Sequence, residues 1–195
     1  MPLSEKILVI TQARMTSTRL PGKILLEINH LTLLHYHLER LHNTDWQVVV
    51  ATTTNEADNA VQAFCEKEGV PCYRGSEHNV LQRFFETAKK YHPDIVVRVT
   101  SDCPLIDAGL IAKGLKMYRD ENSKHAYVSN CFPRSYARGF DFEIFSMDQL
   151  QDAYANATEL NDLEHVTPYI WTNKSGRVKL LNLRSEEHTS ELQSQ

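Results

Sequence analysis

Seven short apolar runs recur along the chain, and most are rich in β-branched residues. Runs of this kind between polar or turn residues are typical of buried strands. They predict strands over residues 7–10, 48–51, 70–73, 95–100, 126–129, 142–145 and 178–181. Between them, apolar residues at helical spacing predict helices over 31–41, 80–88, 108–119, 147–157 and 163–172. A further helix is predicted to follow the capping residues 52–55 and to run to residue 68.

Strands alternate with helices along most of the chain, which indicates βαβ units and a largely parallel sheet covered on both faces. The crossovers should be right-handed. The fold class predicted is α/β, a Rossmann-like three-layer α/β/α sandwich. A chain of 195 residues with no internal repeat or linker suits a single domain, which we place over residues 1–183.

The loop after the first predicted strand concentrates positive charge. Arg14, Arg19 and Lys23 fall within ten residues, and Pro21-Gly22 forces a turn before the lysine. Loops at the carboxyl ends of parallel strands are where α/β folds bind phosphate, and arginine forks match phosphate oxygens. The loop fits neither the Walker A nor the dinucleotide-binding glycine pattern. We expect a triphosphate site; the alternative is a solvated basic loop.

Asp102 follows the strongest predicted strand, 95–100. A carboxylate in this position lies beside the phosphate loop of the neighbouring strand. Because Mg²⁺ uses one or two carboxylates together with substrate phosphates, Asp102 is the candidate metal ligand. The alternative is that Asp102 is a turn or cap residue. Asp107 is expected to cap the next helix.

Composition and charge limit the kinds of ligand and partner that the protein is expected to bind. The net charge of −4 argues against a general nucleic-acid surface, so any anion site must be local. No apolar run approaches a membrane span and no signal peptide is evident, so a cytoplasmic protein without a membrane partner is expected. The four cysteines lack metal or redox spacing and are interpreted as reduced thiols. We interpret His35, His37 and His42 as a solvated helix face.

Three runs carry a family resemblance: Ala-Arg-Met-x-Ser-Thr-Arg-Leu-Pro-Gly-Lys at 13–23, Asp-x-Pro-Leu at 102–105 and Glu-His-Val-Thr-Pro at 164–168. Together they resemble the cytidylyltransferases that make CMP-activated acidic sugars, above all the spore-coat-polysaccharide type. The resemblance spans Ile7 to about Leu183. It implies a fold of the nucleotide-diphospho-sugar transferase type and a Mg²⁺ ion on Asp102.

The resemblance also implies residue roles. Arg14, Arg19, Lys23 and Asp102 would be catalytic. The expected nucleotide contacts are Gln12, Ala13, Arg14, Thr16, Ser17, Arg19, Lys23, Ser76 and Arg83. Without the resemblance, Ser76 is interpreted as a helix cap and Arg83 as a surface cation. The expected acceptor-side residues are Arg134, Arg138, Asp141, Glu143, Glu164 and His165.

Alternatives remain on the acceptor side. Asp141 and Glu143 share one face of a predicted strand, where they would meet sugar hydroxyls or a second metal. The alternative is edge-strand carboxylates facing water. Either Arg134 or Arg138 would pair with the carboxylate of an acidic sugar.

The reaction implied is transfer of CMP from CTP to a sugar hydroxyl, with release of pyrophosphate. The partners would be CTP, a small sugar and a second copy of the chain, joined through an apolar patch around Tyr169 and Trp171. Two other functions stay open. One is a nucleotide-sugar-dependent glycosyltransferase, although the chain lacks the usual Asp-x-Asp metal motif. The other is a non-catalytic nucleotide-binding module.

Residues 184–195 have no apolar period and resemble a translated sequencing adaptor. We therefore expect this tail to be non-native, and we exclude it from the fold. Members of the resembled family continue beyond this point with another strand and helix. If that segment supplies a metal ligand, the present chain would bind nucleotide and turn over poorly.

Overall fold

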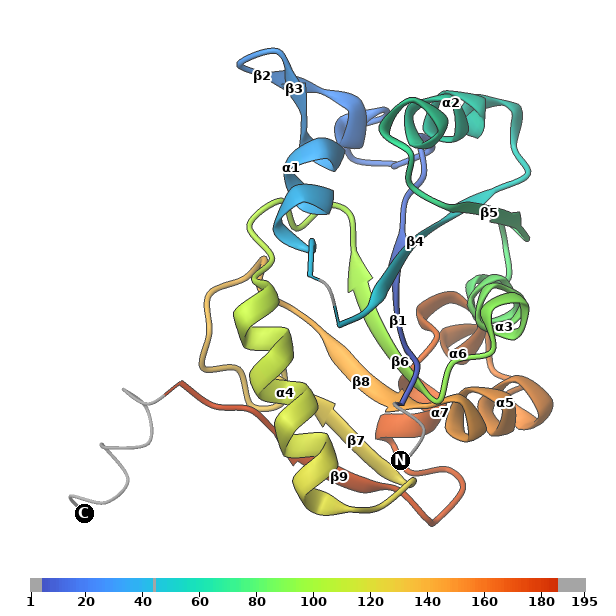
Figure 1. The fold of residues 1–195 in the computed structure, drawn as a ribbon. Coiled ribbons are helices and arrows are strands. Elements are labelled where there is room, and N and C mark those ends of the chain that lie inside the picture. The colour runs from blue at the N-terminus through green and yellow to red at the C-terminus, as the bar shows by residue number, and fades with distance from the viewer. Residues whose placement is uncertain (1–4, 44, 186–195) are drawn as a thin grey trace.

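Seven strands form one sheet in the computed structural model, which describes residues 5–43 and 45–185 (Figure 1). The order across the sheet is β5-β4-β1-β6-β8-β7-β9. The strands are β1 (Ile7–Gln12), β4 (Gln47–Thr53), β5 (Cys72–Gly75), β6 (Ile95–Thr100), β7 (Ala126–Ser129), β8 (Glu143–Ser146) and β9 (Lys179–Asn182). A separate hairpin pairs β2 (Glu27–Ile28) with β3 (Leu31–Thr32).

Helices cover both faces of the sheet (Figure 1). They are α1 (Leu33–Arg40), α2 (Asn59–Glu68), α3 (Val80–Tyr91), α4 (Ala108–Glu121), α5 (Met147–Asn156), α6 (Leu160–His165) and α7 (Pro168–Trp171). Apolar side chains of α1, α2 and α4 pack on one face, and those of α3, α5, α6 and α7 pack on the other. This arrangement confirms the three-layer α/β/α prediction.

Within the seven-stranded sheet, all strands but one run in the same direction. β8 is antiparallel to both of its neighbours, β6 and β7, whereas the other pairings are parallel. No helix separates β7 from β8, and a parallel connection would need a long crossover. The chain therefore turns back at the carboxyl edge of the sheet, and residues 130–142 lie at that edge.

The local signals for strands and helix ends are confirmed. Each predicted strand is present within about two residues of its expected ends. Gly69 ends α2 in the left-handed region at φ 67°. Asp107 caps α4 by accepting the Leu110 N–H at 2.9 Å. Ser146 and Gln149 form the reciprocal capping box at the start of α5.

One helix prediction is wrong. The predicted helix over 163–172 is two short helices, α6 and α7, because Val166 leaves the helical region at φ 71°. Pro168 has no N–H to continue the first helix, and it fits the first turn of the second. The predicted helix over 31–41 is present as α1, which begins at Leu33 because Leu31 and Thr32 pair with β2.

The interpretation of His37 as a solvated residue is also wrong, because its side chain is fully buried. His35 is half-buried against Glu68, and His42 is exposed as expected. The four cysteines are free. No helix among the described residues is long and apolar enough to cross a bilayer. Beyond Ser185, the tail expected to be non-native lies outside the described residues.

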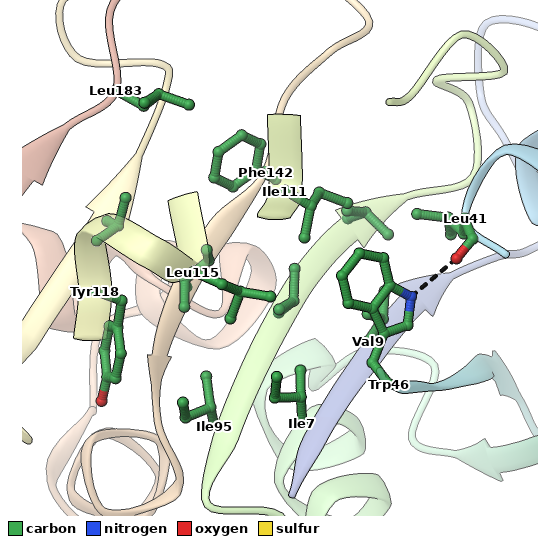
Figure 2. Close-up of a cluster of buried hydrophobic side chains, with 14 of the residues drawn as sticks. Ile7, Val9, Leu41, Trp46, Ile95, Ile111, Leu115, Tyr118, Phe142 and Leu183 are labelled. Carbon is green, nitrogen blue, oxygen red and sulfur yellow. Dashed lines mark hydrogen bonds between the residues drawn. The ribbon is translucent and has the colours of Figure 1, made fainter. Parts of the chain in front are cut away.

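A cluster of apolar side chains joins α4 to the centre of the sheet (Figure 2). Ile111, Leu115 and Tyr118 of α4 share this cluster with Ile7 and Ile95, the first residues of β1 and β6. Trp46 closes one side, and its indole N–H donates to the Leu41 carbonyl at 2.9 Å. The buried polar tip of Trp46 is thereby satisfied.

Gly114 on α4 sets the distance between this helix and β8. A Cβ at this position would lie 2.5 Å from Phe142 Cε2 and 2.9 Å from Ile144 Cδ1. We predict that Gly114→Ala destabilises the protein by about 1–3 kcal/mol through overpacking, despite a gain of about 1 kcal/mol in helix propensity. Urea unfolding measures the change. Phe142→Leu in the same chain should recover part of the loss, and additive effects would contradict this account.

Candidate active site

The parallel pairing of β1 with β6 brings the two predicted site loops together. Gln12 lies opposite Thr100 at the carboxyl ends of these strands. Residues 13–23 follow the first strand and residues 101–107 follow the second. Between them lies a cleft of about 180 Å³, lined by Gln12, Ala13, Arg14, Ser17, Thr18, Arg19, Lys23, Ile24, Arg83, Thr100, Ser101 and Asp102.

The cation loop, residues 13–23, is folded back on itself by the Pro-Gly turn. Gly22 adopts φ 71°, in the left-handed region that favours glycine, and its N–H donates to the Met15 carbonyl at 2.8 Å. The short helix η1 (Lys23–Leu25) begins directly afterwards. The turn therefore places Lys23 beside the cleft that Arg14 and Arg19 also line.

Lys23 and Asp102 form an ion pair across the cleft, with 2.6 Å between Nζ and Oδ2. Partial burial opposes ionisation of Asp102, but hydrogen bonds, of which that from Lys23 is the larger, outweigh it and lower the pKa of the carboxyl group. The Asp102 side chain is 41% exposed, so its carboxylate remains open to the cleft.

Arg14 and Arg19 are exposed, and within the described part of the chain no ion pair neutralises either. Two unpaired guanidinium groups on one small cleft make a strongly positive surface. Such a surface suits a ligand with several negative charges.

Arg83 is not the surface cation that the residue pattern alone predicted, because it is only 2% exposed. Its guanidinium donates to the Ser76 carbonyl, and its Nε has no hydrogen-bond partner. Burial, together with the charge of Arg14, lowers the pKa of Arg83 to about 10. Arg83 thus adds a third guanidinium group, deeply placed, to the lining of the cleft.

Asp58 was not identified from the sequence. It ends the short helix η2 (Glu56–Asp58), is fully buried, and accepts the Met15 N–H at 2.6 Å and the Thr53 hydroxyl. Asp58 therefore fixes the backbone of the cation loop next to Arg14. A lone aspartate in a polar stretch gives no sequence signal for such a distant contact.

Two predicted nucleotide contacts do not line the cleft. The Thr16 hydroxyl points to Glu77, with a donor–acceptor distance of 3.4 Å. The Ser76 hydroxyl accepts the Asn79 N–H at 3.0 Å, but Asn79 itself caps α3, so the alternative interpretation of Ser76 as the helix cap is wrong. Both residues border the loops that form the cleft, but their side chains are engaged elsewhere.

A second cleft, of about 420 Å³, shares Thr100 and Asp102 with the first. Its far wall is the loop at residues 130–142, which contributes Arg138, Gly139 and Asp141. The two arginines predicted on the acceptor side, Arg134 and Arg138, differ in whether an ion pair engages them. Arg134 forms a bidentate ion pair with Asp141, whereas Arg138 is exposed and has no ion-pair partner among residues 5–43 and 45–185.

The interpretations of Glu143 are both wrong. It is neither an edge-strand carboxylate facing water nor open to a sugar, because β8 is an interior strand and Glu143 is 7% exposed. Arg98, the Tyr127 hydroxyl and the Thr167 hydroxyl all donate to its carboxylate, the last at 2.6 Å. Glu143 is thus the centre of a buried polar network.

Glu164 and His165 are exposed at the end of α6 and line neither cleft. The structure therefore does not bring these two predicted acceptor residues to the site. Thr167, from the same Glu-His-Val-Thr-Pro run, makes the contact with Glu143 described above. The motif accordingly joins the short helices to the sheet.

The acidic groups on the two clefts fit a divalent cation that shares its ligands with a substrate. Asp102 and Asp141 line the same cleft, and their carboxylate oxygens are ligands that Mg²⁺ prefers. Among the described residues, no three histidine, cysteine or acidic side chains converge as a metal site. A cation held here would therefore need ligand oxygens or water to complete its coordination.

Comparisons with known proteins agree with this geometry. A family model described as cytidylyltransferase matches residues 8–192. The chain is 39% identical over 170 residues to the uncharacterized protein MJ1063 of Methanocaldococcus jannaschii, covering 86% of this chain and 68% of that protein. It is 34% identical over 171 residues to the spore coat polysaccharide biosynthesis protein SpsF of Bacillus subtilis, covering 84% and 69%.

A solved structure extends the likeness to three dimensions. A cytidylyltransferase from Leptospira borgpetersenii superposes with a TM-score of 0.87 at 36% identity, covering 93% of this chain and 77% of that one. The fold is thus the nucleotide-diphospho-sugar transferase type of α/β sandwich, as the resemblance implied. With a family model that spans most of its length, the chain belongs to the cytidylyltransferase family.

Proposed function

We propose that this protein transfers CMP from CTP to a hydroxyl group of an acidic sugar and releases pyrophosphate. One observation carries the proposal: Arg14, Arg19, Lys23 and Asp102 line a single cleft at the carboxyl edge of the sheet. Membership of the cytidylyltransferase family supports CTP as the nucleotide. The biosynthetic role named for SpsF supports a saccharide acceptor.

The reaction is an in-line displacement at the α-phosphorus. The sugar oxygen forms a new bond to phosphorus, while the bond to the bridging oxygen breaks and pyrophosphate leaves with that electron pair. Catalysis of such steps is mainly positioning and charge stabilisation. Arg14, Arg19 and Lys23 would neutralise the triphosphate and the departing pyrophosphate. Arg83 would provide further positive charge at the back of the cleft.

Asp102, whose side chain is 41% exposed, would hold Mg²⁺. The ion would supply charge neutralisation at the phosphate oxygens. Lys23 now occupies one oxygen of Asp102, and the phosphates of the bound nucleotide would give its ammonium group a second anionic partner.

The acceptor would occupy the second cleft, which adjoins the first at Asp102. Arg138 is the proposed partner of the sugar carboxylate, because Asp141 already engages Arg134. Tyr169 and Trp171 remain candidates for a dimer contact. The ring of Trp171 already stacks on Phe132, with 5.1 Å between centroids.

The glycosyltransferase alternative is less consistent with the site. Its closest motif here is Asp141-x-Glu143, and Glu143 is buried and bonded to three donors. A non-catalytic binding module would have no need for an open carboxylate such as Asp102. The spacing of the loop cations and this carboxylate therefore favours transfer chemistry.

The proposed function is tested by calorimetric titration with CTP, UTP, ATP and GTP, each with and without Mg²⁺, followed by pyrophosphate release with a panel of acidic sugars. Selective binding of CTP with Mg²⁺, and pyrophosphate release that needs a sugar, is the expected result. Binding without base preference, or release of free sugar from a nucleotide sugar, would contradict it.

We predict that Lys23→Ala and Asp102→Asn each lower kcat by about 10²–10³-fold, the usual loss when a group that stabilises transition-state charge is removed. Stability should change little, because the pair is partly exposed and such pairs contribute at most about 1 kcal/mol. Steady-state kinetics and thermal unfolding measure the two effects. Lys116→Ala breaks an exposed pair with Asp120 outside both clefts and serves as the matched control. Wild-type turnover in both site variants would contradict the catalytic roles proposed for Lys23 and Asp102.

We predict that Arg138→Ala raises the KM for an acidic sugar by at least about tenfold, since a charge-assisted contact is worth about 1.5–3 kcal/mol. The KM for CTP should be unchanged. Arg138→Lys should recover part of the loss, because the charge remains while the bidentate fork is lost. Saturation curves for the sugar at fixed CTP, and for CTP at fixed sugar, give the two constants. Equal KM values for wild type and Arg138→Ala would exclude Arg138 as the acceptor contact.

A further inference from the structure

The helix that follows the cation loop, α1, carries a buried histidine whose ring is bonded on both sides. His37 is fully buried. Its Nδ1 lies 2.9 Å from the Cys103 carbonyl oxygen, and its Nε2 lies 2.8 Å from the Thr11 hydroxyl. A single side chain thus joins two segments that are far apart in the sequence.

The partners of His37 fix its protonation. A carbonyl oxygen only accepts hydrogen bonds, so Nδ1 must carry the proton. Burial lowers the pKa of His37 to about 4, which leaves the ring neutral near pH 7. Nε2 is then the acceptor, and the Thr11 hydroxyl donates a hydrogen bond to it. Both ring nitrogens are satisfied in one orientation of the ring.

Thr11 and Cys103, the two partners of His37, each lie next to a segment that lines the first cleft. Thr11 precedes Gln12 at the end of β1, and Cys103 follows Asp102 in the loop after β6. One helical turn beyond His37, Arg40 donates from Nε to the Ile106 carbonyl at 2.7 Å. Helix α1 therefore holds the loop at 101–106 at two points.

We propose that His37 is a positioning residue that sets the place of Asp102 relative to the cation loop. The inference rests on the proposed function, in which Asp102 and Lys23 act on the same triphosphate. The His37 side chain lines neither cleft, so it would contact neither the nucleotide nor the sugar. It acts through the Cys103 carbonyl, and errors in position of about 1 Å at a reacting centre cost about 10²-fold in rate.

Two substitutions separate this role from a general contribution to stability. His37→Asn places an amide N–H two bonds from Cβ, where Nδ1 stands, so it keeps the donor to Cys103 and loses the contact with Thr11. His37→Gln extends its amide towards Thr11 and loses the donor to Cys103. Each variant gives up one hydrogen bond of the ring, so both should lower the Tm.

The expected result is a split between the variants. His37→Asn should keep kcat within about threefold of wild type, whereas His37→Gln should lose about 10–100-fold, as is usual for removal of outer-shell partners at such sites. The KM for CTP should change little in either, because the cation loop is retained. Equal losses of kcat in the two variants, in proportion to their loss of Tm, would overturn the proposal.

Amide hydrogen exchange gives a readout that does not depend on turnover. The Ser101 and Ile106 N–H groups donate to the Gln12 and Cys103 carbonyls, both at 3.2 Å. His37→Gln should exchange at least about tenfold faster at these amides, with Val96 and Val97 in β6 unchanged, and His37→Asn should match wild type. Equal exchange rates at the Ser101 and Ile106 amides in wild type and both variants would overturn the role of His37. Absence of pyrophosphate release from wild type would overturn the proposed function alone.

Discussion

The side-by-side parallel pairing of β1 and β6 is the constraint on which the site depends. Residues 7–10 of β1 are at most 3% exposed, and burying a large aliphatic side chain stabilises a fold by about 1.5–3 kcal/mol. A slip of one residue would turn every side chain of the strand to the opposite face. The register that sets Gln12 opposite Thr100 is therefore fixed by the core, and so is the meeting of the two loops.

The lining of the first cleft brings several positive charges close together. Arg83 is buried near Arg14, and the charge of Arg14 helps to depress its pKa. Asp58 and Glu77 offset part of this repulsion, and Asp58 also ties down the loop backbone. The site thus holds cations in an arrangement that costs free energy, and a polyanion would relieve that cost. Preorganised charge of this kind needs little rearrangement when the ligand arrives.

Local patterns predicted the strands, the caps at Asp107 and Ser146, and the residues of the cation loop, because each depends on neighbours in the sequence. They did not predict contacts made across the fold. The burial of His37, Arg83 and Glu143 depends on which elements cover them, and hydrophobic spacing does not carry that information. The direction of β8 was likewise missed, since a strand pattern is the same read in either direction.

The reversed strand β8 has a consequence for which wall of the second cleft can change without disturbing the sheet. Because the chain returns to the same edge without a crossover helix, the loop at residues 130–142 is a surface excursion between two strands anchored in the core. Asn130 holds the base of this loop through the Phe140 carbonyl and the Phe142 N–H. The residues between can change in length and chemistry without touching the pairing of β1 with β6. One wall of the second cleft can therefore be rebuilt by exchange of a single loop, with the strands that present the cation loop and Asp102 left intact.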